Sequence, residues 1–557
     1  MGKRFANLSC FLAVCVCATV VRGLFASDIV LAIPPDGERS VQVVDPKGAK
    51  RVLVTFNVPA SDVQQIWRPD LKQPYLGRKW WLSATSSSMC NMPYIAFFNM
   101  AERNRFSFGA AVLEWDCELS SKINQEKGVY TVTLVVAADE SSAIRPFQVT
   151  IDRRQLVWTE SLADWRNSLV YGGGSYPEAA WRPVYCSWYA VHASLSQEWV
   201  ERTAAIAAKL GFGTFILDDG WSYDESKRVN PQTITQWYRD VGRWNAFSLR
   251  KFPDFKSHRE RIHRLGLKYV VWVAPYFIGV RTDAYGKWRG KLADQTPFEG
   301  NVLANVSDKE MMESVTKQLV DLLRESDLDG LKIDFLDYIK PSVDKPCSGY
   351  GLAYVRDLMA RLKRVKPDGL FEFRQSYATP LTVPLGTQFR AGDVPFEWLC
   401  NIMRIAQMRL AVGDRVPVHA DPICWAGCET PENISRHFMA AMAGVPMLSM
   451  DLVSMSPEQQ REIARWMQFY SRKVEPFQRN GKWNVAYRNG GLSYMTSMLE
   501  DRAIVFVVDP GACSAALDST LAGKKIIVLN LSYEPVRVRG LEIPAAQVRE
   551  VADMPGA

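Results

Sequence analysis

The feature that most constrains the fold is a run of apolar, strand-like segments in the middle of the chain, separated by helical ones. Eight such segments occur, at residues 183–189, 212–221, 267–276, 329–337, 369–377, 386–394, 414–422 and 445–452. Amphipathic stretches such as "QEWVERTAAIAAKLGF" lie between them. Strands that alternate with helices form parallel sheets, and eight units predict a closed (β/α)8 barrel. The alternative is an open doubly wound sheet, but the glycine-rich phosphate turn of that fold is missing after the first strand.

Both flanks of this region have the pattern of β structure. Between residues 27 and 165, alternating runs such as "RVLVTFNV" and "GVYTVTLVVAA" are separated by polar turns, which predicts an antiparallel sandwich. Residues 480–557 contain similar runs, including "RAIVFVVD" and "KKIIVLNLS". The predicted fold is therefore α/β: a TIM barrel over residues 175–475, flanked by an N-terminal antiparallel β-sandwich and a C-terminal β-sandwich domain.

Residues 1–26 have the pattern of a secretory signal peptide. Lys3 and Arg4 precede an apolar run over about residues 8–21, and Gly23 and Ala26 are small residues suited to cleavage. A membrane anchor is the alternative, but the run is short for a span, and no later stretch is apolar enough to cross a bilayer. We expect a secreted or periplasmic protein with no membrane span after removal of the signal. Disulfides are permitted there, but the sequence does not define their pairing.

Composition argues against several classes of function. The formal net charge is +7, but no basic stripe is interleaved with aromatic residues, so nucleic-acid binding has no support. The chain has five widely spread histidines and no CxxC pair, which argues against a zinc site. We expect neither a metal nor an organic cofactor.

Polar side chains collect at the carboxyl ends of the predicted barrel strands, where such barrels carry their active sites. Along the chain they are Asp218, Asp219, Trp221, Trp272, Lys332, Asp334, Glu372, Arg374, Gln375, Arg390, Asp393, His419, Asp421 and Asp451. A helix N-cap is an equally good interpretation of Asp421 and Asp451, because aspartate is a favoured cap. A cap does not explain Lys332 or Glu372.

The fourth strand, "DGLKIDFLD", places two charged residues on one face. Leu331, Ile333 and Phe335 face one way and are expected to contact the surrounding helices. Lys332 and Asp334 then face the barrel mouth. A neighbouring ammonium group keeps a carboxylate ionised, which suits a nucleophile better than a proton donor.

The other two aspartates of this stretch lie outside the strand. Asp329 precedes it, at the end of the barrel associated with stability, and is interpreted as a turn residue. Asp337 follows the strand and is expected to be solvated or a cap. We therefore expect substitution of Asp337 to matter far less than substitution of Asp334.

Glycoside hydrolysis with retention requires a second carboxyl group, about 5 Å from the nucleophile. Asp393, in "FRAGDVPF", is the best candidate, because apolar surroundings are expected to raise its pKa and suit it to acid/base work. The competitor is Glu372, which Arg374 is expected to hold ionised and so unfit as an acid.

Four motifs in order resemble glycoside hydrolase families 27 and 36 of clan D, the α-galactosidases, α-N-acetylgalactosaminidases and raffinose-synthase-like enzymes. They are "LDDGW", "KID", an arginine-then-aspartate motif on the sixth strand and "VPMLSMDLVSMSPEQ", within about residues 183–470. Family 36 also has β domains on both sides of its barrel. "KIDF" lacks the tryptophan and asparagine common in family 36, and "EFRQSY" replaces its glycine-rich segment. With "VYCSWY", which is closer to the raffinose-synthase-like enzymes, these departures indicate a divergent branch.

The resemblance implies a substrate site on this barrel. It assigns Asp334 as nucleophile and Asp393 as acid/base, with Arg390 preceding it. It implies that Asp218 and Asp219 grip the hydroxyls at carbons 4 and 6 of galactose. The other residues of the predicted substrate site are Lys332, which bonds sugar hydroxyls, Glu372 near carbon 2, and Arg374, Gln375, Trp188, Trp221 and Trp272.

The leading hypothesis is a retaining α-galactosidase that acts on an oligosaccharide or glycoconjugate with a terminal α-galactosyl residue, through a covalent glycosyl-enzyme. An α-N-acetylgalactosaminidase or a raffinose-synthase-like transglycosylase would use the same residues. A carbohydrate-binding barrel without catalysis is a hypothesis of another class, and it predicts the loss of one catalytic carboxylate. A metal- or phosphate-dependent lyase would need clustered histidines or a phosphate-binding glycine loop.

Overall fold

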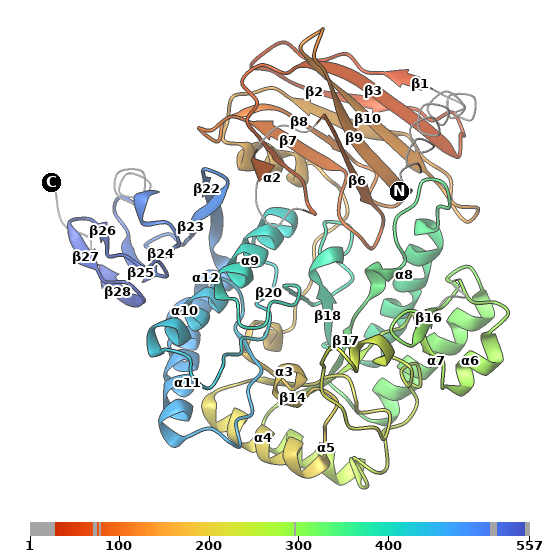
Figure 1. Cartoon of the computed structure of the whole chain (residues 1–557), viewed down its shortest axis with the longest axis vertical. Helices are drawn as coiled ribbons and strands as arrows, with labels where there is room; N and C mark the ends of the chain where they lie inside the picture. Colours follow the sequence, from red (N-terminus) through yellow and green to blue (C-terminus); the bar gives the residue numbers. More distant parts are fainter. Residues whose placement is uncertain (1–27, 71–74, 77–79, 294–296, 513–520, 552–557) are drawn as a thin grey trace, which may run out of the picture.

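The computed structural model describes residues 28–70, 75–76, 80–293, 297–512 and 521–551. The predicted signal peptide, residues 1–26, lies outside the described residues. No helix within them is long and apolar enough to cross a membrane. In chain order, the protein consists of two N-terminal sheets, a barrel and a C-terminal sheet (Figure 1).

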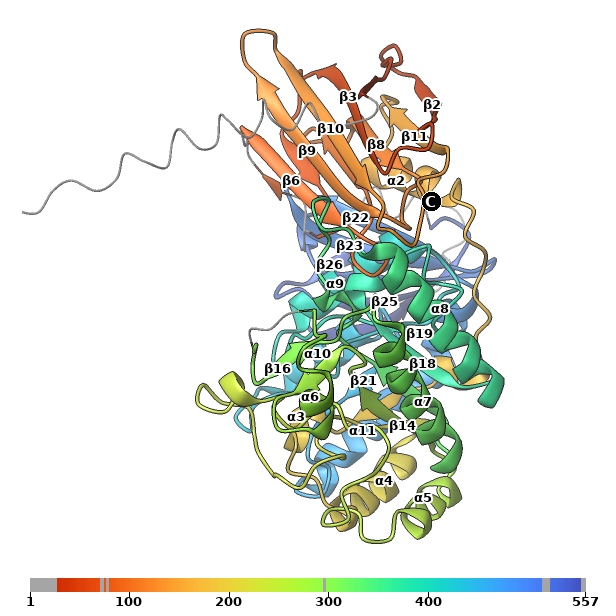
Figure 2. The same ribbon diagram turned by 90° about the vertical axis from the view of Figure 1, so that its right-hand side faces the viewer.

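The two N-terminal sheets pack face to face above the barrel (Figures 1 and 2). One has the strand order β1-β3-β10-β9-β6 and the other β2-β11-β8-β7-β4-β5. Every pair is antiparallel except β1–β3, so the predicted antiparallel sandwich is confirmed apart from that pair. Alternate side chains such as Val54, Phe108 and Leu134 are buried between the sheets. The strands are β1 Asp28–Val30, β2 Arg39–Val44, β3 Arg51–Pro59, β4 Gln65–Trp67, β5 Tyr75–Leu76, β6 Trp81–Ser86, β7 Tyr94–Phe98, β8 Asn104–Ala110, β9 Asp116–Asn124, β10 Val129–Ala137 and β11 Phe147–Asp152.

Eight parallel strands form the barrel, and each of the eight predicted segments contains one of them. The order is β20-β19-β18-β17-β14-β13-β12-β21, and a parallel bridge between His419 and Val445 joins the two ends of this order. The predicted barrel is confirmed. The strands are β12 Val184–Cys186, β13 Thr214–Leu217, β14 Lys268–Val273, β17 Gly330–Ile333, β18 Leu370–Arg374, β19 Gln388–Arg390, β20 Val418–His419 and β21 Met447–Leu448.

Helices between the strands cover the barrel, and the longer ones do so with an apolar face. In α7, for example, Met311, Val315 and Leu319 are buried at helical spacing, and the Asp308 side chain caps the first turn. The helices, with one hairpin, are α2 Trp158–Asn167, η2 Glu178–Trp181, α3 Trp188–Val191, α4 Gln197–Leu210, η3 Ile234–Gln236, α5 Phe255–Arg264, β15 Phe277–Gly279, α6 Asp283–Trp288, β16 Asn301–Leu303, α7 Lys309–Glu325, η4 Leu336–Tyr338, α8 Ser348–Val365, η5 Gln375–Tyr377, α9 Trp398–Val412, α10 Pro431–Ala441, α11 Pro457–Phe469, η6 Tyr470–Val474 and α12 Glu475–Asn480.

The C-terminal part is one five-stranded sheet covered by a short hairpin. The sheet order is β22-β23-β24-β25-β28, with β24–β25 parallel and the other pairs antiparallel. Val536, Val538 and Ile543 of the hairpin share a core with Val505 and Val528 of the sheet. The elements are β22 Lys482–Arg488, β23 Gly491–Met498, β24 Arg502–Val507, η7 Pro510–Ala512, β25 Lys525–Asn530, β26 Val536–Val538, β27 Leu541–Ile543 and β28 Gln547–Val551.

The N-terminal sheets dock on loops at the carboxyl end of the barrel strands. Asp116 at the start of β9 accepts hydrogen bonds from the backbone N–H of Ser342 at 3.0 Å and of Ser348 at 2.9 Å. These residues lie between β17 and the first turn of α8, where backbone N–H groups favour a carboxylate. Asn91 likewise donates its backbone N–H to the carbonyl of Ser376, at 2.8 Å. The N-terminal sheets therefore border the barrel mouth.

Candidate active site

Strand register brings the predicted polar residues to one level of the barrel. Trp272 pairs with Lys332, and Lys332 pairs in turn with Glu372 on the next strand. One step later, Arg374 pairs with Arg390. Side chains in register on neighbouring strands point to the same face. Residues from four separate predicted segments therefore meet at the carboxyl end of the strands.

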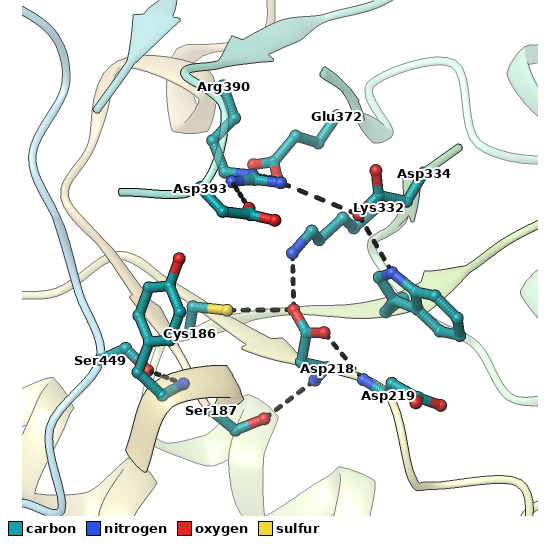
Figure 3. A network of polar contacts seen from close by, with 12 residues as sticks. Cys186, Ser187, Asp218, Asp219, Lys332, Asp334, Glu372, Arg390, Asp393 and Ser449 are labelled. Carbon is teal, nitrogen blue, oxygen red and sulfur yellow. Dashed lines mark hydrogen bonds and ion pairs between the residues drawn. The ribbon is translucent and has the colours of Figure 1, made fainter. Parts of the chain in front are cut away.

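A buried ion pair forms one side of the site (Figure 3). Lys332 Nζ lies 2.6 Å from Asp218 Oδ2, with only 6% and 4% of the two side chains exposed. Burial by itself would lower the pKa of Lys332, but the Asp218 carboxylate outweighs burial and raises it. Cys186 donates its thiol to the same oxygen at 3.2 Å. The pair is thus a buried donor and acceptor fixed at one side of the barrel mouth.

Asp219 is held by aromatic residues. Trp237 Nε1 donates to Asp219 Oδ2 at 2.7 Å, and the Tyr223 hydroxyl donates to the same oxygen at 3.1 Å. Burial raises the pKa of Asp219 to about 6, despite these hydrogen bonds. Asp219 also donates its backbone N–H to Asp218 Oδ1 at 2.9 Å. The two adjacent aspartates thus act as one rigid unit.

Asp334 lies just past the end of β17. Its Oδ1 accepts from the backbone N–H of Phe335 at 3.0 Å, and its Oδ2 accepts from Trp272 Nε1 at 3.2 Å. Two guanidinium groups lie slightly farther away, Arg374 at 3.5 Å and Arg390 at 3.8 Å. The carboxylate is therefore fixed at the mouth beside positive charge, as a nucleophile requires.

The strand alternation ends at Asp334. Phe335 has a left-handed backbone with φ 60°, which turns its side chain away from the direction that simple alternation predicts. Its ring stacks on Phe277, with centroids 4.8 Å apart, and meets Tyr338 edge-on. The prediction that Phe335 contacts the surrounding helices was wrong, because the backbone turn places it among the loops over the mouth.

Arg390 is the centre of the charge network (Figure 3). Its side chain is 2% exposed, and its Nη1 lies 2.9 Å from Asp393 Oδ1 and 2.6 Å from Asp421 Oδ1. Its Nε lies 3.3 Å from Glu372 Oε1. A planar guanidinium can serve several carboxylates at once, which an ammonium group does less well. Arg390 therefore fixes the relative positions of acidic groups from three strand ends.

The charge state predicted for Asp393 was wrong. Arg374 Nη2 lies 2.7 Å from its Oδ2, and Arg390 binds its other oxygen. The surrounding protein by itself would raise the pKa of Asp393, but these two guanidinium groups outweigh it and hold the pKa well below its usual range. The side chain is 41% exposed, so Asp393 lies at the open rim of the site. In the ligand-free state it is a carboxylate.

The prediction for Glu372 was also wrong, both in the expected partner and in the direction of the pKa shift. Arg374 points toward Asp334 and Asp393, not toward Glu372. Burial raises the pKa of Glu372, although Lys332 and Arg390 act in the opposite direction. Its carboxylate is 1% exposed and accepts a hydrogen bond from a glutamine side chain on β19. Glu372 is thus a buried support at the barrel floor.

Neither aspartate for which a cap was considered is one. Helices α10 and α11 are capped by the side chains of Thr430 and Ser456. Asp421 instead binds Arg390 and is fully buried. Asp451 accepts a hydrogen bond from the indole N–H of Trp199 at 3.1 Å. Asp421 therefore joins the charge network, whereas Asp451 fastens helix α4 to the loop after β21.

The three tryptophans predicted to line the pocket lie in different surroundings. Trp221 is fully buried and donates its indole N–H to the Trp272 carbonyl at 2.8 Å, so its assignment as a pocket wall was wrong. Trp272 contacts Asp334 directly. Trp188 is half-buried and meets Trp237 edge-on at 5.5 Å. Trp221, after β13, thus belongs to the core beneath the site, whereas Trp272 contacts the candidate nucleophile.

The two remaining predicted residues are backbone supports. Gln375 Oε1 accepts from the backbone N–H of Gly392 at 3.0 Å, which fixes the loop that carries Asp393. His419 hydrogen-bonds the Ala180 carbonyl at 2.8 Å and is fully buried. Burial lowers the pKa of His419 to about 4.

The two aspartates around β17 also differ from expectation. Asp337 is mostly buried in η4, and one of its carboxylate oxygens has no hydrogen-bond partner in the described part of the chain. It caps neither η4 nor α8, so the expectation of a cap was wrong. Asp329 does more than form a turn. It accepts hydrogen bonds from His263, Lys268 and the backbone N–H of Tyr269, at 2.9, 3.0 and 2.9 Å.

Sequence reasoning missed two contributors. Cys186 and Tyr189 lie in the first predicted segment, and Tyr189 donates its hydroxyl to Asp421 Oδ2 at 2.9 Å. Cys186 alternates with the outer residues of its strand, so parity could have indicated it. The Tyr189 contact joins residues 232 positions apart in the chain, and no local pattern reveals it. Within the described residues, no group of three or more His, Cys, Asp or Glu residues could hold a metal ion.

Residues 174–349 match the family model described as Melibiase. Over 365 residues the chain is 25% identical to the α-galactosidase Mel36A of Lactobacillus acidophilus, a match that covers 59% of this chain and 46% of that protein. It is 22% identical to α-galactosidase 1 of Pediococcus pentosaceus, over 65% of this chain and 50% of that one. The chain is related to the GH36 α-galactosidases.

Solved structures of GH36 enzymes share this fold. The α-galactosidase AgaA of Geobacillus stearothermophilus superposes with a TM-score of 0.64 at 14% identity, over 81% of this chain and 67% of that one. The chain spans about half the length of the two curated relatives it matches. The Melibiase match contains Asp218, Lys332 and Asp334, whereas Asp393 lies beyond it.

Proposed function

We propose that this chain is a retaining α-galactosidase that hydrolyses terminal α-D-galactosides. The observation that supports it most is the pair Asp334 and Asp393, two carboxylates at the barrel mouth that share Arg374 and Arg390. Relatives named α-galactosidases, and variants of AgaA solved in complex with raffinose and with stachyose, indicate the sugar class.

In this mechanism the galactosyl ring binds with its polar edge on Asp218 and Lys332. Asp334 attacks the anomeric carbon while the bond to the leaving oxygen breaks, and Asp393 gives its proton to that oxygen. The second step reverses the roles: Asp393 takes a proton from water, and the water oxygen displaces Asp334. No metal or organic cofactor enters either step.

The proton of Asp393 needs a source, because Arg374 and Arg390 keep this group ionised in the ligand-free site. A bound sugar that separates Asp393 from Arg374 removes one of the two cations and raises the pKa of Asp393. Formation of the glycosyl-enzyme neutralises Asp334 and frees both guanidinium groups from it. The acid/base cycle is thus coupled to the movement of Arg374.

The decisive experiment measures hydrolysis of 4-nitrophenyl α-D-galactoside, 4-nitrophenyl α-N-acetylgalactosaminide and raffinose, with the product anomer followed by NMR. We expect turnover of the galactosides and initial release of α-galactose. Preferential turnover of the N-acetylgalactosaminide would reassign the sugar, β-galactose as first product would contradict retention, and no turnover of any substrate would contradict the glycosidase assignment.

We also propose that residues 1–26 direct the chain out of the cytoplasm. The support is the order of Lys3 and Arg4, an apolar run and small residues. Mass spectrometry of the mature N-terminus after expression in the natural host tests this proposal. A chain that still begins at Met1 would contradict it.

A further inference from the structure

A cavity of about 410 Å³ opens beside the candidate acid/base, between the barrel mouth and the N-terminal sheets. Arg374, Gln375 and Gly392, the residue before Asp393, line it together with Asn91 of the N-terminal part. The leaving group of a galactoside must extend from the anomeric carbon past the acid/base. The cavity is therefore placed to receive the leaving group.

One wall of this cavity carries Arg404, whose guanidinium has no partner among the residues that the structure describes. Arg404 of α9 is partly exposed and forms no hydrogen bond or ion pair with any residue that the structure describes. Its guanidinium packs closely against Gly392: a Cβ atom at that glycine would lie 2.4 Å from Arg404 Nη1. The glycine before Asp393 thus leaves room for a cation immediately beside the acid/base.

A second cation lies on the opposite loop. Lys340 Nζ donates to the Asp337 carbonyl at 3.0 Å, and within the described chain it forms no ion pair. Two carboxylates also line the cavity, but Asp70 is already paired with Arg68 at 2.9 Å. Among the described residues, the cavity is thus lined by two cations without ion-pair partners, Arg404 and Lys340, and by one carboxylate without such a partner, Asp337.

Arg374 connects this cavity with the catalytic carboxylates. It lines the cavity and at the same time lies 2.7 Å from Asp393 and 3.5 Å from Asp334. An anion in the cavity would attract the same guanidinium and would weaken its hold on Asp393. Asp393 would then regain the proton that the first step consumes.

We propose that the sugar on the leaving side of the scissile bond carries an anionic substituent, a sulfate ester or a carboxylate, which Arg404, Lys340 and Arg374 bind in this cavity. The inference rests on the proposed α-galactosidase activity and names its substrate class. Arginine and lysine bind such oxyanions by charge-assisted hydrogen bonds. The galactosyl ring itself remains neutral in its own site.

The test compares kcat/KM for three matched disaccharides: α-galactosyl-galactose, the same disaccharide with a sulfate ester on the reducing sugar, and α-galactosyl-galacturonic acid. We expect the wild-type chain to prefer one anionic disaccharide over the neutral one by about tenfold or more. Whichever anionic disaccharide is preferred shows whether the cavity binds a sulfate ester or a carboxylate. Equal kcat/KM for all three disaccharides would overturn the proposal.

Arg404→Met is the diagnostic variant, because Arg404 contacts none of the proposed catalytic groups. We expect it to abolish the preference while kcat/KM for the neutral disaccharide stays within about twofold, and Arg404→Lys to restore part of it. Lys340→Met should reduce the preference in the same direction. An equal loss on neutral and anionic substrates in Arg404→Met would indicate a structural role and would overturn the proposal.

A binding measurement keeps this inference separate from the proposed activity. Calorimetry with galactose 6-sulfate, galacturonic acid and galactose needs no turnover. Tighter binding of an anionic sugar to the wild-type chain, lost in Arg404→Met, would support the anion site even if no galactoside is hydrolysed. Equal binding of the three sugars to a chain without turnover would reject both proposals.

Discussion

The two ends of strand β17 each carry an aspartate, and the two are held in opposite ways. Asp329, before the strand, has three short hydrogen bonds from His263, Lys268 and the backbone of Tyr269. Asp334, after the strand, has two hydrogen bonds and two longer ion contacts that it shares with Asp393. A saturated carboxylate stabilises the fold, whereas one with loosely shared partners can exchange them for a ligand. Burial alone does not separate the two, since both residues are 5% exposed.

Substitution at the mouth end should give the largest effect on activity. We expect Asp334→Asn to lower kcat for 4-nitrophenyl α-galactoside by roughly 10⁴-fold or more, because the amide cannot form the glycosyl-enzyme. The melting temperature should change little, since the amide oxygen can still accept one of the two hydrogen bonds, from Phe335 or from Trp272. Substantial residual kcat, together with a large fall in melting temperature, would show that Asp334 stabilises the fold and is not the nucleophile.

Asp393→Asn should affect substrates differently according to how strongly their leaving group needs a proton. We expect a loss of about 10² to 10⁴-fold in kcat/KM on raffinose, whose leaving oxygen needs a proton, and a smaller loss on the 4-nitrophenyl galactoside. Steady-state kinetics on both substrates measure this difference. Equal losses on the two substrates would contradict a role as proton donor.

Substitution at the opposite end of the strand should act on stability alone. Burial by itself would raise the pKa of Asp329, but the hydrogen bonds from His263, Tyr269 and Lys268 outweigh burial and lower the pKa to about 2. Relative to its ordinary value of 3.8, this shift corresponds to about 2 kcal/mol of stability at neutral pH. We expect Asp329→Asn to reduce the free energy of unfolding by about that amount, with kcat nearly unchanged. Urea unfolding and kinetics at pH 7 measure both quantities.

The same pKa shift sets a pH window. Because the folded state holds the proton of Asp329 less tightly than the unfolded state, its contribution is present above about pH 4 and is lost as the pH falls through about 2. The difference in unfolding free energy between the wild-type chain and Asp329→Asn should therefore shrink over that interval. A difference that stays constant down to pH 2 would show that the ionised group is not its source.

The smallest effect is expected for Asp337→Asn. Asp337 lies past the strand, and its side chain touches neither Asp334 nor Asp393 through any hydrogen bond in the described structure. We expect kcat for the 4-nitrophenyl galactoside to stay within about threefold of the wild-type value. A loss approaching that of Asp334→Asn would extend the catalytic machinery into η4.

The periodicity of apolar residues predicted the barrel because each strand and each helix has its own pattern within a short stretch of sequence. All eight strands fall within the predicted segments, and Lys332 and Asp334 lie at the mouth as parity required. Trp221 and Phe335 were misplaced because their directions depend on turns beyond the strand ends, where alternation no longer applies.

The sequence by itself determined the fold class and which residues lie at the carboxyl ends of the strands, since both follow from spacing along the chain. Only the tertiary structure decided the charge states and the partners. Arg374 neighbours Glu372 in sequence but binds Asp393, and Arg390 joins Asp393 to Asp421 from the next strand. A pKa depends on distances of a few ångströms between groups far apart in the chain. Those distances exist only once the barrel has closed.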